Sequence, residues 1–288
     1  MDGLIVVDKP AGVSSALAVD RVKRALGATR AGHGGTLDPI ATGVLLICVD
    51  QATKLAQYLL GDDKAYEAEG LLGVQTDSLD RTGKVTAERA VTATRDAMLR
   101  VLAARMGEQD QVPPMFSAIK QGGVRLYKHA RAGEEVPRTA RRIRIDQLEL
   151  LVFEPPRFRI AITCSKGTYV RSVVADIGTA LGDGAHMTEL RRTRSGKFTI
   201  DQAVRLDQVA PGVPMIGLAN LTSLPSVVAA PEMLGPIRSG LQLQAEALPV
   251  EKLEQFQIVD EQGRLVAIAH VGAGRIIYDR VFGVPVEA

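Results

Sequence analysis

The sequence has few cysteines and histidines, and it has no segment that could span a membrane. Its 288 residues include two cysteines and four histidines, and these are scattered without zinc-ligand spacing. No run approaches the roughly 18 apolar residues of a membrane span, and the first residues lack the basic flank and cleavage site of a secretory signal. These absences predict a cytoplasmic protein without metal ligands, in which Cys48 and Cys164 are buried thiols.

A charge excess of one sign is also missing, since 35 Lys and Arg against 33 Asp and Glu leave a net charge of +2. The positive charge is nevertheless concentrated. Residues 119–144 carry eight Lys and Arg against two Glu, and smaller basic clusters occupy residues 21–30 and 191–197. Such clustering on a balanced chain is the electrostatic pattern of a nucleic-acid-binding surface. The alternative is a set of separate solvated faces.

The most informative stretch is residues 30–49, which joins a glycine-rich loop to the apolar run 44–49. The run predicts a buried strand. Asp38 lies between the two halves, and the following Pro39 restricts it to extended backbone angles. A carboxylate held at the start of a buried strand suits nucleophilic or acid–base chemistry. From the spacing alone, a simple Asp-Pro turn is the favoured interpretation.

Helix-like and strand-like patterns interleave along the chain. Ser14 and Ser15 offer N-cap chemistry to a helix over 16–26, and two hairpins are predicted over 144–164 and 187–200. Hairpins among helices favour an α+β fold with a mixed, antiparallel-rich sheet flanked by helices over a doubly wound fold. Asp77 and Asp80 are rival carboxylates to Asp38, but their Ser/Asp/Gly turn predicts that both are solvated.

The composition shifts after Val209, where prolines and glycines become frequent. We therefore predict a first domain over residues 1–224, a linker over 225–236 and a second domain over 237–288. Short strand-like runs predict that this last part is a small β-barrel. Residues 246–288 hold four basic and seven acidic residues, so strong RNA binding by this part is doubtful.

Six segments, taken in order, carry a resemblance that no single one of them could establish. They are 8–15 (DKPAGVSS), 33–43 (HGGTLDPIATG), 64–66 (KAY), 112–120 (VPPMFSAIK), 165–171 (SKGTYVR) and 184–192 (GAHMTELRR). Over roughly residues 3–210 the chain resembles the TruB family of tRNA pseudouridine synthases. The resemblance implies the pseudouridine synthase fold, with a basic thumb insertion at about 111–144 and a PUA-like C-terminal barrel.

The resemblance also implies a role for individual residues. Asp38 is the expected catalytic group. The expected substrate-binding residues are His33, Tyr66, Tyr169, Arg171 and Leu190, with His33 as a wedge and Arg171 as the cation that keeps Asp38 ionised. The expected supporting residues are Lys9, Pro10 and Lys166. The expected RNA-backbone contacts are Arg131, Arg138, Arg141, Arg142, Arg191 and Arg192.

The implied reaction converts a flipped-out uridine in the T-loop of tRNA, at position 55, to pseudouridine. It needs no cofactor and no metal. The expected partner is the T-stem and T-loop of tRNA, bound by a monomer without an obligatory protein partner. The alternatives are the catalytic subunit of a guide-RNA pseudouridylation complex, a non-catalytic tRNA-binding or tRNA-folding protein, and a hydrolase that uses His33 and Asp38.

Overall fold

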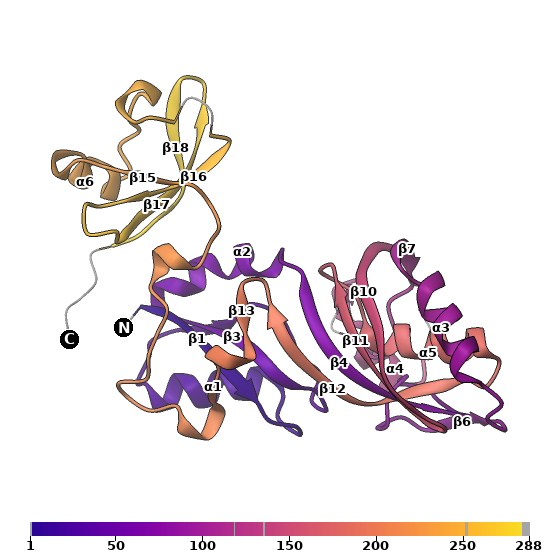
Figure 1. Cartoon of the computed structure of the whole chain (residues 1–288). Helices are drawn as coiled ribbons and strands as arrows, with labels where there is room; N and C mark the ends of the chain where they lie inside the picture. The colour runs from indigo at the N-terminus through magenta and orange to yellow at the C-terminus, as the bar shows by residue number, and fades with distance from the viewer. Residues whose placement is uncertain (1, 118, 135, 251–252, 284–288) are drawn as a thin grey trace. The chain divides into compact units, whose positions relative to one another are not determined.

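The computed structural model of the protein describes residues 2–117, 119–134, 136–250 and 253–283 (Figure 1). The chain divides into two compact units. The first unit comprises Met1–Pro39, Leu45–Gly61 and Asp201–Ala288, and the second comprises Ile40–Val44 and Asp62–Ile200. The chain therefore leaves and re-enters each unit, and strand β3 (Thr42–Val49) contributes residues to both.

The first unit contains a small mixed sheet around β3. The other strands are β1 (Gly3–Lys9), β2 (Ala31–His33) and β14 (Val204–Arg205). Strand β1 runs parallel to β14, and β2 runs antiparallel to β3. Every residue of β3 from Gly43 to Val49 is buried, so the strand predicted from the apolar run is confirmed.

Helices follow the strands of this unit closely. Helix α1 (Ser15–Ala25) begins after Ser14, whose hydroxyl accepts a hydrogen bond from the Leu17 amide at 3.2 Å. This is the N-cap arrangement that the sequence predicts. The 3₁₀ helix η1 (Asp50–Leu55) and helix α2 (Ala56–Leu60) follow β3. The later 3₁₀ turns are η2 (Ile200–Gln202), η3 (Leu206–Gln208), η4 (Leu218–Asn220) and η5 (Ala245–Ala247).

The second unit is built on a longer sheet in which neighbouring strands are antiparallel. Its order is β12 (Ala185–Ser195), β4 (Lys64–Leu72), β11 (Arg157–Cys164), β10 (Arg141–Glu154) and β7 (Gly107–Gln111). The first residues of β3 run parallel to β12, and β13 (Phe198–Thr199) forms a hairpin with it. Both predicted hairpins and the α+β, antiparallel-rich character are therefore confirmed.

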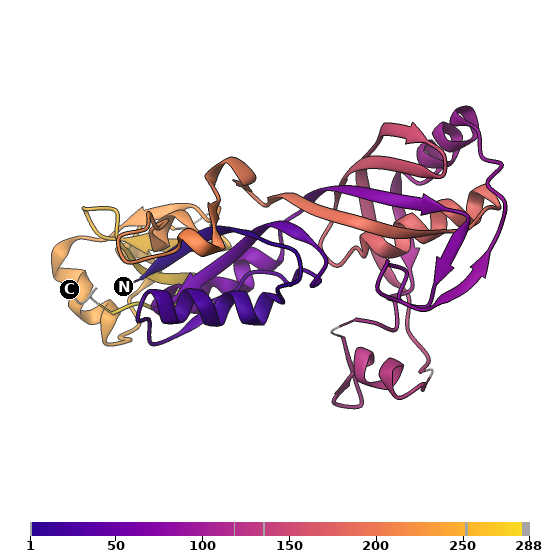
Figure 2. The same ribbon diagram turned by 90° about the horizontal axis from the view of Figure 1, so that it is seen from below.

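Smaller elements complete the second unit. Strands β5 (Val74–Thr76) and β6 (Val85–Glu88) pair with each other, and helix α5 (Val170–Leu181) packs on β12 and on α3 (Arg95–Ala104). Residues 112–140, which we call the arm, project from the sheet between β7 and β10 (Figure 2). The arm contains β8 (Lys120–Gln121), β9 (Val124–Arg125) and α4 (Leu126–Arg131).

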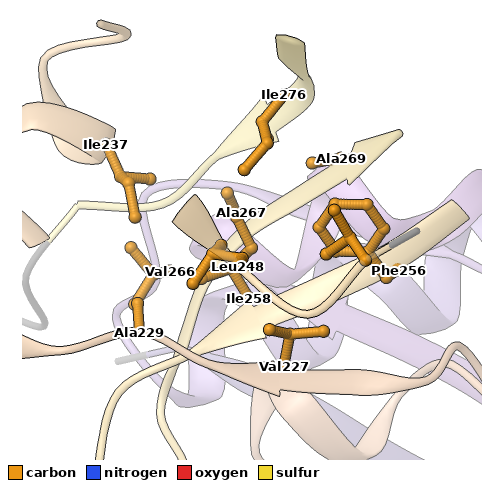
Figure 3. Close-up of a cluster of buried hydrophobic side chains, with 11 residues drawn as sticks. Val227, Ala229, Ile237, Leu248, Phe256, Ile258, Val266, Ala267, Ala269 and Ile276 are labelled. Atoms are coloured by element: carbon orange, nitrogen blue, oxygen red, sulfur yellow. The ribbon is translucent and has the colours of Figure 1, made fainter. Parts of the chain in front are cut away.

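The C-terminal part of the first unit has its own sheet and its own core of buried side chains. Its sheet has the order β15 (Ser226–Val228), β16 (Gln255–Val259), β17 (Leu265–Gly272) and β18 (Arg275–Val281). Helix α6 (Pro231–Arg238) contributes Ile237 to the same cluster of buried side chains as Val227 and Phe256 of the strands (Figure 3).

The structure places β15 and most of α6 in residues 225–236, where the sequence suggested a linker. Two of the prolines that favoured a linker belong to this helix, and Pro236 lies inside it. Pro231 occupies its first turn, where the missing amide proton costs no hydrogen bond. The expected barrel is a four-stranded sheet in the described part of the chain.

Candidate active site

The loop that carries Asp38 belongs to the first unit and is held through its main chain. The hydroxyl of Ser15 donates to the Leu37 carbonyl at 2.9 Å and accepts from the Leu37 amide at 2.8 Å. On the other side of Asp38, the carbonyl of Pro39 accepts from the Gly12 amide at 2.8 Å. The main chain of Leu37 and of Pro39, the residues on either side of the half-buried Asp38, is therefore held by hydrogen bonds.

Two glycines let this loop approach the buried strand. A Cβ on Gly34 would lie 2.9 Å from Cβ of Leu59, and Gly35 has a φ of 130°. The Gly34 amide donates to the carbonyl of Leu46 in β3 at 2.9 Å. A side chain at either glycine would displace the loop, so the glycine-rich sequence before Asp38 has a direct structural cause. His33 ends β2 just before them, opposite Ile47 and half-buried.

Lys9 is fully buried, and its ammonium group is bound by main-chain oxygens. It donates to the carbonyls of Val13 at 2.7 Å, Pro10 at 2.9 Å and Pro39 at 3.4 Å. A buried charge requires such partners. Lys9 thus connects the Pro10 turn to the residue that follows Asp38, an arrangement compatible with the expected supporting role.

Tyr66 and Leu190 share one face of the sheet in the second unit. Tyr66 of β4 lies opposite Arg192 of β12, and Leu190 lies opposite Ala68. Residues directly opposite each other in an antiparallel pair present their side chains on the same face. Leu190 is 7% exposed, while Tyr66 is half-buried. The structure therefore brings these two predicted substrate-binding residues to neighbouring positions.

Arg171 is buried near the start of α5 and binds two other segments of the second unit. Its guanidinium donates to the Ser78 carbonyl at 3.1 Å and the Phe116 carbonyl at 2.9 Å, and it lies 3.5 Å from Oδ2 of Asp80. Arg171 is 3% exposed, so it is not a charge on the helix surface.

The prediction that Asp80 is solvated is wrong. Asp80 is 5% exposed, and its Oδ1 accepts from the Ser78 hydroxyl at 2.8 Å and from the amide and hydroxyl of Thr82 at 2.9 and 2.6 Å. Its other oxygen faces Arg171. Asp77 does remain exposed, and it accepts from the Lys84 amide at 2.8 Å. The turn composition could not separate the two carboxylates, because the difference arises from the long-range Arg171 contact.

Tyr169 is held by a residue that sequence reasoning missed. The side-chain amide of Gln111 accepts from the Tyr169 amide at 2.8 Å and donates to its carbonyl at 3.1 Å. Arg141 covers the tyrosine ring, with its guanidinium carbon 4.8 Å from the ring centroid. Only the sequence position of Gln111, just before the Pro-Pro pair of a family-like motif, could have pointed to it.

The arginines expected to contact RNA differ in their surroundings. Arg142 is exposed and pairs with Glu108 at 3.1 Å and Asp110 at 3.6 Å. Arg138 donates to the Pro113 carbonyl at 3.1 Å, at the base of the arm. Arg131 ends α4, and its side chain lies outside the described residues.

The prediction for Arg192 requires correction. This residue is 1% exposed, and its Nε donates to the Val44 carbonyl at 2.6 Å, so its guanidinium is not presented to a phosphate group. Its neighbour Arg191 alternates to the other side of β12, is half-buried and donates to the Thr42 hydroxyl at 3.4 Å. Lys166 is exposed in the turn before α5.

The two cysteines are buried, as the sequence predicts. Burial raises the pKa of the Cys48 thiol to about 12 and, as the largest influence, that of Cys164 to about 11, so both are protonated at neutral pH. Within the ranges that the structure describes, no three His, Cys, Asp or Glu side chains gather as metal ligands. No helix in the described part of the chain has the length and apolar character to span a membrane.

The fold is that of the pseudouridine synthases. A chain in the crystal structure of a Cbf5-Nop10-Gar1 complex matches 97% of this chain and 84% of its own length, with a TM-score of 0.74 and 26% identity. A chain in the structure of an H/ACA RNP bound to a substrate RNA containing 2'-deoxyuridine matches 98% of this chain and 85% of its own length, with the same TM-score of 0.74 and 25% identity.

Sequence comparison defines the family within this class. The model for the TruB family pseudouridylate synthase N-terminal domain matches residues 23–170, and the model for the tRNA pseudouridylate synthase B C-terminal domain matches 171–215. The chain belongs to the TruB family of pseudouridylate synthases. The tRNA pseudouridine synthase B of Pseudomonas paraeruginosa (strain DSM 24068 / PA7) is 50% identical over 72% of this chain and 68% of its own length. That of Ectopseudomonas mendocina (strain ymp) is 41% identical over 96% and 94%.

Proposed function

We propose that this protein isomerises a uridine of tRNA to pseudouridine, at position 55 in the T-loop, and that it acts without a guide RNA or protein partner. The relatives named tRNA pseudouridine synthase B are 40–50% identical to this chain, whereas the chains from the Cbf5 and H/ACA complexes are 25–26% identical. The observation that carries the proposal is the placement of Asp38, whose two neighbouring residues, Leu37 and Pro39, are held through their main chain by Ser15, Gly12 and Lys9.

The reaction is an isomerisation in which all atoms of the nucleotide are retained. The bond between C1′ of the ribose and N1 of uracil breaks, the base turns, and a bond forms between C1′ and C5. The proton leaves C5, and N1 gains a proton. A carboxylate held in place can attack the sugar or the base as a nucleophile, or it can abstract a proton as a base. Our assignment of Asp38 as the catalytic residue covers each of these roles.

The remaining roles follow from the chemistry of the side chains. A uridine in the folded T-loop must leave its stack before a carboxylate can reach it. We assign His33 as the residue that stacks in its place, Tyr66 and Tyr169 as aromatic contacts to the base, and Leu190 as an apolar wall of the uracil site. We assign Arg171 as the cation that keeps Asp38 ionised. The basic arm attracts the phosphate groups of the RNA.

The C-terminal sheet is assigned a secondary part in this scheme. Its position after the catalytic region supports a PUA-like module, while its acidic composition argues against a large electrostatic contribution to RNA binding. We therefore propose that it recognises RNA by shape or stabilises the first unit. The expected working form is a monomer on the T-stem and T-loop.

The test is incubation of the purified protein alone with an unmodified tRNA transcript, followed by nucleoside analysis and mapping of the modified position. Pseudouridine at position 55 without any guide is the expected result. A requirement for guide RNA would assign the chain to a pseudouridylation complex instead. Binding without product would favour a tRNA-binding or tRNA-folding protein, and release of free uracil would favour a hydrolase.

A further inference from the structure

The root of the arm is one pair of residues facing each other across two strands. Gln111 is the last residue of β7, and Arg141 is the first residue of β10, and the two are direct partners in the antiparallel ladder. The chain leaves the sheet after Gln111 and returns at Arg141. Any displacement of the arm that moves its root must therefore act on these two residues first.

Gln111 commits its whole side-chain amide to one residue. It is 5% exposed, and its Oε1 accepts from the Tyr169 amide while its Nε2 donates to the Tyr169 carbonyl. A carboxamide that uses its donor and its acceptor on the same residue fixes the position of that peptide segment in two directions. Gln111, on the β7 side of the arm root, therefore holds the main chain of Tyr169.

Arg141 holds the same tyrosine by its ring. The guanidinium lies 4.8 Å from the ring centroid, within the range of a cation–π contact. Its Nε and Nη2 atoms are buried and make no hydrogen bond within the described part of the structure, so the aromatic ring is the principal partner that the structure gives this group. Nε and Nη2 are therefore not presented to a phosphate group, and the RNA-backbone contact expected of Arg141 stays a prediction for its remaining nitrogen, Nη1.

A third connection runs from the arm to the next functional residue along the chain. Arg171 lies two residues after Tyr169, and its Nη2 donates to the carbonyl of Phe116, which is an arm residue. The segment with both Tyr169 and Arg171 is therefore joined to the arm or its root at three points. Each point is a specific polar or aromatic contact instead of general apolar packing.

We infer that Gln111 and Arg141 are positioning residues that couple the arm to Tyr169, so that engagement of the arm by RNA sets the position of this tyrosine. The inference rests on the proposed function, in which Tyr169 contacts the target base and the arm contacts the tRNA backbone. Small displacements of a group that positions substrate lower the rate strongly, by as much as about 100-fold for 1 Å. The coupling would make catalysis depend on correct engagement of the arm.

The central experiment compares Gln111→Ala with Gln109→Ala. Gln109 lies on the same strand, and its side chain donates to the Arg105 carbonyl at 2.6 Å instead of to Tyr169. We expect Gln111→Ala to lower the single-turnover rate of pseudouridine formation roughly 10- to 100-fold with little change in the Kd for tRNA. Gln109→Ala should leave both quantities unchanged. Gln111→Glu, which keeps the acceptor for the Tyr169 amide, should recover part of the rate.

Amide hydrogen exchange at Tyr169 provides a readout that does not depend on activity. Exchange should be faster in Gln111→Ala than in the wild type, and it should stay slow in Gln111→Glu. Binding of tRNA should slow this exchange in the wild type, and Gln111→Ala should lose that effect. Observation of all three would support a connection between arm and tyrosine.

Several results would overturn the inference. If Gln111→Ala shows faster amide exchange at Tyr169 but a normal rate of pseudouridine formation, the two hydrogen bonds from Gln111 to Tyr169 have no functional role. An equal loss of rate in Gln109→Ala would indicate general destabilisation of β7. If the wild type forms no pseudouridine, the proposed function fails, but exchange at Tyr169 with and without tRNA still decides whether Gln111 and the arm hold this residue.

Discussion

Two loops in different units of the molecule are held by the same device, although they depend on different parts of the fold. In each loop, a buried polar side chain binds both the amide and the carbonyl of one residue. Ser15 does so at Leu37, just before Asp38, and Gln111 does so at Tyr169. Ser15 belongs to the first turn of helix α1, whereas Gln111 lies at the root of an outlying arm.

The two loops are therefore expected to respond differently when RNA binds the arm. The carboxylate loop is tied to the capped helix α1 and to the buried part of strand β3. The tyrosine segment is tied to the arm and its root, which we propose RNA engages. We therefore expect mutations around Asp38 to act on the chemical step directly. Mutations around Tyr169 should act on the link between RNA engagement and the chemical step.

The largest effect is expected for Asp38→Asn. An amide keeps the size and shape of the side chain but is neither a nucleophile nor a base at neutral pH, so product formation should be abolished. Binding of tRNA, measured by filter retention, should remain within a few-fold of the wild type because no phosphate contact is removed. Substantial turnover by this variant would remove Asp38 from the catalytic role.

The next effect is expected for Ser15→Ala, with Ser14→Ala as the matched control. Loss of the Ser15 hydroxyl leaves the Leu37 amide and carbonyl without their partner, at a cost of about 1–3 kcal/mol for each unsatisfied group. The loop should loosen, and the rate of the chemical step should fall roughly 10- to 100-fold. Ser14→Ala removes a helix cap worth about 1 kcal/mol but touches no loop residue.

The comparison between these two serines is decisive because both changes weaken the start of the same helix. A lower kcat in Ser15→Ala alone, with unchanged tRNA affinity and with partial recovery in Ser15→Thr, would identify a positioning role. Equal losses in Ser14→Ala and Ser15→Ala, in proportion to their lower thermal stability, would reduce Ser15 to a structural residue.

Local sequence patterns were sufficient for much of the fold. The apolar run of β3, the Ser14 cap of α1 and the alternation in β10 and β11 each act over a few residues, and each prediction is confirmed. The motifs around Asp38 and Arg171 pointed to segments that the structure holds by specific hydrogen bonds. The roles of those residues in catalysis stay predictions.

The features that sequence reasoning missed are contacts between distant segments. Ser15 and Leu37 are 22 residues apart, Gln111 and Tyr169 are 58 apart, and Asp80 and Arg171 are 91 apart. Composition cannot show that such side chains meet, because the tertiary fold brings these segments together. The same limit explains Arg192, whose charge suggested a surface position that its cross-strand setting excludes.

A smaller effect is expected for Arg142→Gln, which tests the arm side of the comparison. Arg142 is an exposed arginine that follows the arm root directly, and Glu108 and Asp110 already compete for its charge. Loss of one phosphate contact should reduce the slope of log Kd against log salt by about 0.7–0.9. Arg205→Gln is the control, since Arg205 is likewise exposed and paired with a carboxylate, at 2.7 Å from Asp207. An unchanged slope in Arg142→Gln would exclude a phosphate contact.

The smallest effect is expected for His33→Ala, because His33 precedes the Ser15-held segment and contributes a ring instead of a reacting group. Loss of a stacking partner for the vacated base position should slow base flipping or weaken tRNA binding by about five-fold, which is the lower end of the 1–3 kcal/mol that stacking of one base on an aromatic side chain contributes. Stopped-flow fluorescence with a base analogue beside the target uridine measures this step.

His33→Phe keeps a planar ring and should retain the wild-type rate, whereas His33→Asn keeps polarity without the ring and should resemble His33→Ala. The reverse pattern would show that His33 acts through hydrogen bonding, and equal behaviour of all variants and the wild type would refute the wedge. In either case the carboxylate loop would keep its geometry, because the bonds that hold Leu37 and Pro39 do not involve His33.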